Sequence, residues 1–174
     1  MKKTAFALSL LLLASCASPT KDVAGKVVSC AQVRTATTPN LKVIGCLDGS
    51  TGAAIKSLRG PMILNVWGSW CAPCKAEIPI LRSFYQKAQG KIQLVGVDVE
   101  ESSIQAGQNF VLKHGITWPN LFDSDSSTRE NFGMGVPVTW FIAADGTVVY
   151  KMIGPFKNDV ELITIASKYL GVKL

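Results

Sequence analysis

Residues 62–74 read MILNVWGSWCAPC, and this stretch decides the fold. Its first part, Met62 to Trp67, is a nearly continuous apolar run of strand length, which predicts a strand buried on both faces. Its last part holds two cysteines, Cys71 and Cys74, spaced as C-x-x-C. Pro73 between them suits the first turn of a helix, where the N–H that proline lacks would have no partner. The cysteines are therefore expected where a buried strand passes into a helix.

This position gives the cysteine pair a specific chemistry. Disulfide exchange needs a thiolate, and the free N–H groups and positive dipole end at a helix N-terminus lower the pKa of a thiol there. Cys71 is therefore predicted to be the nucleophile. Cys74, one helical turn later, is predicted to resolve the mixed disulfide, so that the two form a redox-active disulfide.

Two other uses of the pair fit the sequence less well. Half of a zinc site would need Cys30 and Cys46, which lie 16 residues apart instead of forming a second C-x-x-C. A peroxidase of the peroxiredoxin type would carry Thr three residues before its reactive cysteine, where Gly68 stands here. No pattern in the sequence indicates a metal or a cofactor.

The patterns on both sides of the motif predict an α/β fold, a sandwich of helices around one mixed β-sheet. Pro79 lies inside the helix that follows the motif, and Asp145-Gly146 marks a hairpin turn. The expected strands cover 41–47, 54–58, 62–67, 92–99, 138–143 and 147–151; the expected helices cover 71–88, 103–114 and 158–170, with a short helix ending at 132.

The N-terminus has the pattern of a lipoprotein export signal. Two lysines precede an apolar segment, residues 4–14, that is too short to span a membrane. Residues 13–16 read LASC and resemble the bacterial lipobox, in which small residues precede a cysteine that is lipidated. We expect a signal peptide at 1–15 and a lipid on Cys16, which would anchor the protein to a membrane of the cell envelope, facing the extracytoplasmic side. An ordinary signal peptide with a chance cysteine is the alternative.

After the signal, the chain divides into two parts. Residues 16–38 are expected to form a lipid-anchored tether and N-terminal extension, and residues 39–174 a single domain. Outside the cytoplasm disulfides persist, and Cys30 and Cys46 remain as an even pair. We therefore expect a structural disulfide between them.

Charge argues against nucleic acid as a partner. The chain has 18 Lys and Arg against 12 Asp and Glu, and without Lys2 and Lys3 of the predicted signal 16 basic residues remain. They are scattered, and no basic stripe with interleaved aromatic residues is present in the sequence.

Residues 39–174 resemble the thioredoxin family, in particular its membrane-anchored TlpA, ResA and CcmG-like branch. The resemblance is carried by Trp67, Trp70, Pro79, the segment VPVT at 136–139, the turn Asp145-Gly146, and Gly154. It implies a thioredoxin-like fold with N-terminal extra strands and with Pro137 in a cis peptide bond, in a loop that lies against the C-x-x-C and pairs with the substrate chain. Residues 100–122 correspond to a central insertion that this branch has and simple thioredoxins lack.

Glu77 and Asn65 bear on proton transfer. Glu77 follows Cys74 by three residues, as in ResA-like proteins, where the resemblance implies that such a glutamate assists proton transfer. A solvent-exposed helix acid is the alternative. Simple thioredoxins have a buried aspartate at the position of Asn65, and asparagine cannot titrate, which favours Glu77 as the base.

Other polar residues are expected to have structural roles. His114, before Gly115, suits the C-terminal dipole of its helix. Asp98, Glu100 and Glu101 cluster at the end of a strand and are expected to be solvated.

The resemblance implies a thiol–disulfide oxidoreductase. Such proteins keep the cysteines of exported proteins reduced, including those of apocytochrome c for cytochrome c maturation, and receive electrons from a membrane thiol–disulfide donor. Ala72 and Pro73 add neither a charge nor a histidine that would stabilise the thiolate further, which favours a reductant. A disulfide-forming oxidant is the alternative, and a non-enzymatic binding module, whose C-x-x-C is only a bridge, is a third hypothesis. A monomer is expected.

Overall fold

A computed structural model describes residues 24–133 and 135–174, so the expected signal peptide and Cys16 lie outside the described residues. The strands are β1 (Gly45–Cys46), β2 (Met62–Trp67), β3 (Gln93–Val99), β4 (Asn120–Asp123), β5 (Val138–Ile142) and β6 (Val148–Ile153). The α-helices are α1 (Ala72–Ala88), α2 (Ile104–Lys113), α3 (Arg129–Phe132) and α4 (Asp159–Leu170). Within the described part of the chain, no helix is both long and apolar enough to cross a membrane.

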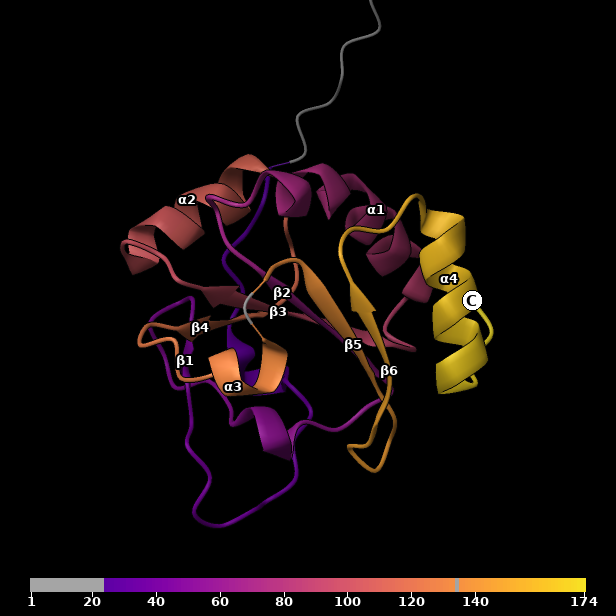
Figure 1. Cartoon of the computed structure of the whole chain (residues 1–174), viewed down its shortest axis with the longest axis horizontal. Coiled ribbons are helices and arrows are strands. Elements are labelled where there is room, and N and C mark those ends of the chain that lie inside the picture. Colours follow the sequence, from indigo (N-terminus) through magenta and orange to yellow (C-terminus); the bar gives the residue numbers. More distant parts are fainter. Residues whose placement is uncertain (1–23, 134) are drawn as a thin grey trace, which may run out of the picture.

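The six strands form one mixed sheet in the order β1-β4-β3-β2-β5-β6. Strands β2, β3 and β4 run parallel, while β5 pairs antiparallel with β2, and β6 with β5. Helices α1, α2 and α4 cover one face of the sheet (Figure 1), and most of the buried side chains in residues 30–58 pack on the other. The predicted α/β class is therefore confirmed.

Strand β2 is central, and all six of its residues are buried, as the apolar run predicted. Helix α1 begins directly after Cys71, which is its N-cap residue, and contains Pro79. It ends at Ala88, where Gln89 adopts a left-handed conformation. The strand-to-helix junction therefore lies where residues 62–74 placed it.

Two expectations for the segment before β2 were wrong. The strand expected over 41–47 is only Gly45–Cys46. The strand expected over 54–58 is instead a 3-10 helix, Ile55–Ser57. The backbone N–H and the hydroxyl of Ser57 both donate to the carbonyl of Ala54, which closes this helical turn.

Strand β4 was missed because its sequence is atypical. It begins and ends with polar residues, Asn120 and Asp123, which strands generally disfavour. Both are nevertheless buried and hydrogen-bonded within the protein. The expected insertion therefore includes α2 and most of an additional parallel strand.

The N-terminal extension packs on the domain from Gly25 onward instead of forming a free tether there. The backbone N–H of Gly25 donates to Leu112 at 2.9 Å, and that of Lys26 to Ile116 at 2.8 Å. The expected disulfide between Cys30 and Cys46 is present and lies in the core on the far side of the sheet from α1. The folded unit is therefore larger than the expected domain of residues 39–174.

Candidate active site at the start of helix α1

The two cysteines of the motif form a disulfide at the N-terminus of α1. Cys71 keeps an exposed fraction of 4%, while Cys74 is completely buried. A protein substrate can therefore reach only the sulfur of Cys71. This difference matches the predicted roles of nucleophile and resolving thiol.

Local backbone geometry favours a thiolate at Cys71. Its sulfur accepts a hydrogen bond from the backbone N–H of Cys74 at 3.1 Å, in the first turn of the helix. The N-terminal end of a helix also stabilises negative charge through its dipole. The helix that follows the motif therefore supplies the electrostatic stabilisation that disulfide exchange needs.

The loop before β5 lies against Cys71. Val136–Pro137 is a cis peptide bond, as the resemblance implied. The sulfur of Cys71 is 3.7 Å from the carbonyl oxygen of Val136. On the other side of this loop, Gly154 donates to the carbonyl of Pro137 and follows Ile153, whose side chain is 83% exposed. The cis-proline loop is thus in contact with the reactive sulfur.

Glu77 lies inside the protein, which excludes the solvent-exposed alternative. It is 1% exposed, and its Oε1 accepts a hydrogen bond of 2.8 Å from the side-chain amide of Asn65. Its Oε2 has no hydrogen-bond partner among the described residues. Burial raises the pKa of Glu77 to about 7, although hydrogen bonds from Asn65 and the backbone of Phe156 oppose this rise. A carboxyl group able to exchange a proton near neutral pH is thus placed one helical turn beyond Cys74.

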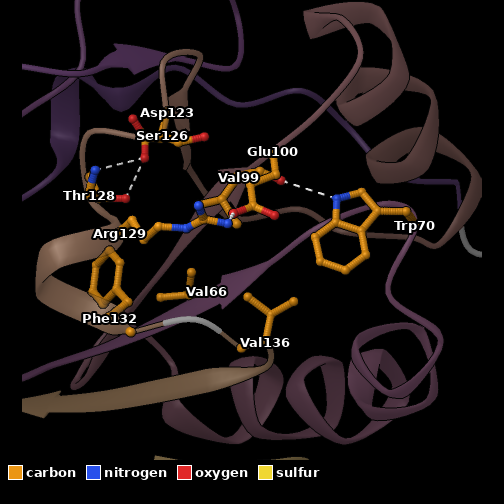
Figure 2. A pocket seen from close by; sticks show the side chains of 12 residues that line it. Val66, Trp70, Val99, Glu100, Asp123, Ser126, Thr128, Arg129, Phe132 and Val136 are labelled. Carbon is orange, nitrogen blue, oxygen red and sulfur yellow. Dashed lines mark hydrogen bonds and ion pairs between the residues drawn. The ribbon is translucent and has the colours of Figure 1, made fainter.

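A hollow that is open to solvent lies beside Trp70 and Val136 (Figure 2). Its apolar lining includes Val66, Val99, Val136 and Phe132. Trp70, which is 55% exposed, forms one wall and donates from its indole to the carbonyl of Val99 at 3.4 Å.

An ion pair joins the two sides of this hollow. The guanidinium of Arg129, at the start of α3, lies 2.6 Å from the carboxylate of Glu100, which follows β3 (Figure 2). The hollow therefore combines an apolar lining with a pair of opposite charges.

Of the three acids expected to be solvated at the end of β3, only Glu100 is exposed. Asp98 is completely buried, which corrects that expectation, and Glu101 is half-buried. Glu101 accepts two hydrogen bonds from Ser69, one from its backbone N–H and one from its hydroxyl at 2.8 Å. The sequence did not indicate a role for Ser69, nor that Glu101 would bind it. The one signal in the sequence for a buried acid here was the charged residue at position 98 in an otherwise apolar strand.

His114 has the structural place expected of it. It is the C-cap residue of α2 and packs against the ring of Phe110. Partial burial lowers the pKa of His114, and the charges of Lys75 and Lys113 lower it further.

Known proteins with similar sequences carry the same chemistry. The family model for the AhpC/TSA family matches residues 35–151. Over 119 residues, the chain is 35% identical to the thiol-disulfide oxidoreductase ResA of Bacillus thuringiensis (strain Al Hakam). This match covers 67% of each of the two chains. Over 130 residues, it is 31% identical to the thiol:disulfide interchange protein CycY of Rhizobium leguminosarum bv. viciae, which covers 72% of this chain and 67% of CycY.

A solved structure is also similar. It is a secreted disulfide oxidoreductase of Mycobacterium tuberculosis, homologous to DsbE of E. coli. It matches with a TM-score of 0.63 and 25% identity, over 73% of this chain and 95% of that one.

Proposed function

The chain is a thiol–disulfide oxidoreductase of the AhpC/TSA family with a thioredoxin-like fold, and we propose that it reduces disulfides of exported proteins, including apocytochrome c during cytochrome c maturation. One observation supports the proposed direction of electron transfer, from this protein to its substrate. Cys71 receives its stabilisation from the start of α1, and the two residues between the cysteines, Ala72 and Pro73, are uncharged. A thiolate without additional stabilisation leaves the dithiol a good reductant.

The exchange has two steps. The Cys71 thiolate attacks one sulfur of the substrate disulfide, that S–S bond breaks, and the released substrate thiolate takes up a proton. Cys74, as a thiolate, then attacks the sulfur of Cys71, the mixed disulfide bond breaks, and the second substrate sulfur leaves as a thiolate that takes up a proton. The substrate gains two electrons and two protons, and the Cys71–Cys74 disulfide seen in the structure is the product.

Glu77 is the proton acceptor for Cys74 in this proposal. Cys74 is completely buried, so bulk water does not reach its thiol directly. Glu77 is one helical turn away, and its raised pKa, about 7, makes proton uptake possible near neutral pH. Asn65 holds the carboxyl in place but cannot itself titrate.

The substrate chain is proposed to bind along the loop of Val136 and Pro137. The carbonyl of Val136 next to Cys71 can accept a backbone hydrogen bond from an extended polypeptide. A side chain that flanks the substrate cysteine would then enter the hollow beside Trp70.

Electrons must return to Cys71 and Cys74 after each cycle. We propose a membrane thiol–disulfide donor as their source, with the protein acting as a monomer held at the extracytoplasmic side of a membrane by a lipid on Cys16. The lipobox-like segment LASC supports this location.

The redox potential of the Cys71–Cys74 pair tests the direction. We expect a value near that of thioredoxin, about −270 mV, and a pair that is largely reduced in cells. Equilibration with glutathione gives the potential, and acid trapping with thiol alkylation gives the state in cells. A potential near −120 mV with a pair resting as disulfide would favour the oxidant. If the Cys71→Ser variant reduced insulin as fast as the wild type, Cys71 would not be catalytic, and only the hypothesis of a binding module would remain.

A further inference from the structure

Asp98 is a buried acid that the disulfide exchange described above does not use. It lies near the end of β3, with no exposed surface, on the side of the sheet covered by α2. Gly107 of α2 packs directly on it, because a Cβ atom at residue 107 would overlap the Asp98 carboxyl group. The helix thus seals this carboxyl group from solvent.

The neighbour of this carboxyl group is another acid. Among the described residues, neither oxygen of Asp98 receives a hydrogen bond from an N–H or O–H donor. The acidic side chain that acts on it is Glu101: besides burial, its charge and proximity raise the pKa of Asp98. Two carboxyl groups offer only acceptors unless one of them holds a proton. A shared proton between Asp98 and Glu101 resolves both observations.

The proton belongs on Asp98. Burial, and secondarily the charge of Glu101 and the hydrogen bond with it, raise the pKa of Asp98 to about 9. Asp98 is therefore protonated at neutral pH and can donate to Glu101. The charged group that acts on it is Glu101. The residues that α2 and the neighbouring strands place against it, Gly107, Trp67 and Phe122, do not titrate.

Glu101 connects this pair to the active site. Its two carboxyl oxygens accept from the backbone N–H and the hydroxyl of Ser69. Ser69 lies in the turn between β2 and α1, two residues before Cys71. Whatever fixes the Glu101 side chain therefore also fixes the turn that carries the reactive cysteine.

We propose that Asp98 is a positioning residue, whose carboxyl group shares one proton with Glu101 and thereby holds Glu101 on Ser69 and the turn that presents Cys71. When Asp98 loses its proton, two negative carboxylates face each other and the contact becomes repulsive. Glu101 then releases Ser69, and the turn loosens. The contact between the Asp98 and Glu101 carboxyl groups is thus maintained at neutral pH and lost at alkaline pH.

A titration of the oxidised protein tests the pair directly, because neither active-site cysteine titrates in the disulfide. The signals are the ¹³C shifts of the Asp98 carboxyl and of the Ser69 Cβ atom, measured from pH 5 to 10.5. We expect both to change with one midpoint near pH 9. In Asp98→Asn the Ser69 step should vanish, while it should persist in Glu130→Gln, a matched exposed acid on α3. An Asp98 midpoint below pH 6, or a Ser69 step that survives in Asp98→Asn, overturns the proposal.

Two variants of similar size test the consequence for the reaction. Asn keeps an N–H donor toward Glu101, whereas Leu has none. At pH 7, the Asp98→Asn variant should reduce insulin at a rate within about twofold of the wild-type rate. The Asp98→Leu variant should be about tenfold slower than the wild type, because it loses the hydrogen bond to the charged Glu101. Thermal melting confirms that both fold. Equal rates for the two variants contradict the proposal, whereas a wild type without insulin reduction would contradict only the proposed function.

Discussion

The side-chain amide of Asn65 donates to Oε1 of Glu77 at 2.8 Å, which fixes a buried carboxyl group between strand β2 and helix α1. The same amide also lies 3.0 Å from the hydroxyl of Thr139 in β5. Three elements thus meet at one amide. A non-titrating residue orients the acid, and the acid itself remains free to exchange a proton through its second oxygen.

Replacing Glu77 by Gln should slow the resolving step. The amide keeps the shape of the side chain but cannot take the proton of Cys74, and positioned general bases contribute about a hundredfold or more. We expect about a hundredfold slower release of substrate, mixed disulfides through Cys71, and no inflection of the rate near pH 7. Rapid-quench trapping with thiol alkylation measures this. Glu130→Gln is the control, and an unchanged pH profile in Glu77→Gln would contradict the role.

Burial of Glu77 should also make stability depend on pH. Its pKa is raised in the folded state, so the folded protein retains a proton that the unfolded chain releases between about pH 4.5 and pH 7. Stability is therefore full below pH 4.5 and falls as the pH rises through 7, by on the order of 3 kcal/mol. Urea denaturation across this range should show a smaller fall in Glu77→Gln. A fall of the same size in both proteins would show that Glu77 does not cause it.

Removing the Cys30–Cys46 disulfide should weaken the fold. Replacing both residues by Ala releases a loop of 16 residues, which the chain-entropy estimate values at about 3 kcal/mol. Urea unfolding of the oxidised protein measures this change. The redox potential of the Cys71–Cys74 pair should stay unchanged, because the two disulfides lie in cores on opposite faces of the sheet. A stability equal to that of the wild type would refute the expectation.

Adding a methyl group at Gly96 should disturb a buried polar contact. The indole N–H of Trp67 donates to the side-chain oxygen of Asn120 at 3.0 Å, and a Cβ atom at residue 96 would overlap both groups. We expect Gly96→Ala to cost about 2 kcal/mol of stability. Gly45→Ala is the matched strand control, since its Cβ would make only an ordinary contact with Phe122. Equal melting temperatures for the two variants would contradict this account.

Replacing Cys16 by Ala should release the protein from membranes. The lipid would be attached through the sulfur of this residue, so metabolic labelling with a fatty acid should label the wild type and not the variant. Fractionation should then find the variant in the soluble envelope fraction. Membrane retention of an unlabelled wild type would exclude the anchor.

The sequence predicted those parts of the fold and the site that depend on local patterns. The apolar run before Cys71, the proline after it and the hairpin at Asp145-Gly146 each determine structure within a few residues. The redox pair and the disulfide of Cys30 follow from residue type and spacing.

What the sequence could not show depends on contacts between distant segments. Asp98 is buried because Gly107 lets α2 approach it, and neither residue indicates this alone. Strand β4 has polar ends, and its pairing with β3 outweighs their low strand propensity. The sequence alone does not decide between a buried and an exposed Glu77, because its burial depends on the side of α1 that faces Asn65.

The attachment of residues 25 and 26 to α2 and to the loop that follows it determines where mechanical load enters the molecule. A pull applied at Ala24 must first separate the hydrogen bonds to Leu112 and Ile116. The tension then reaches Cys30 and passes through its disulfide into β1, at the edge of the sheet opposite β6. Load applied to the N-terminal segment therefore enters the sheet first at this edge strand, and not at β2, the strand that leads to Cys71.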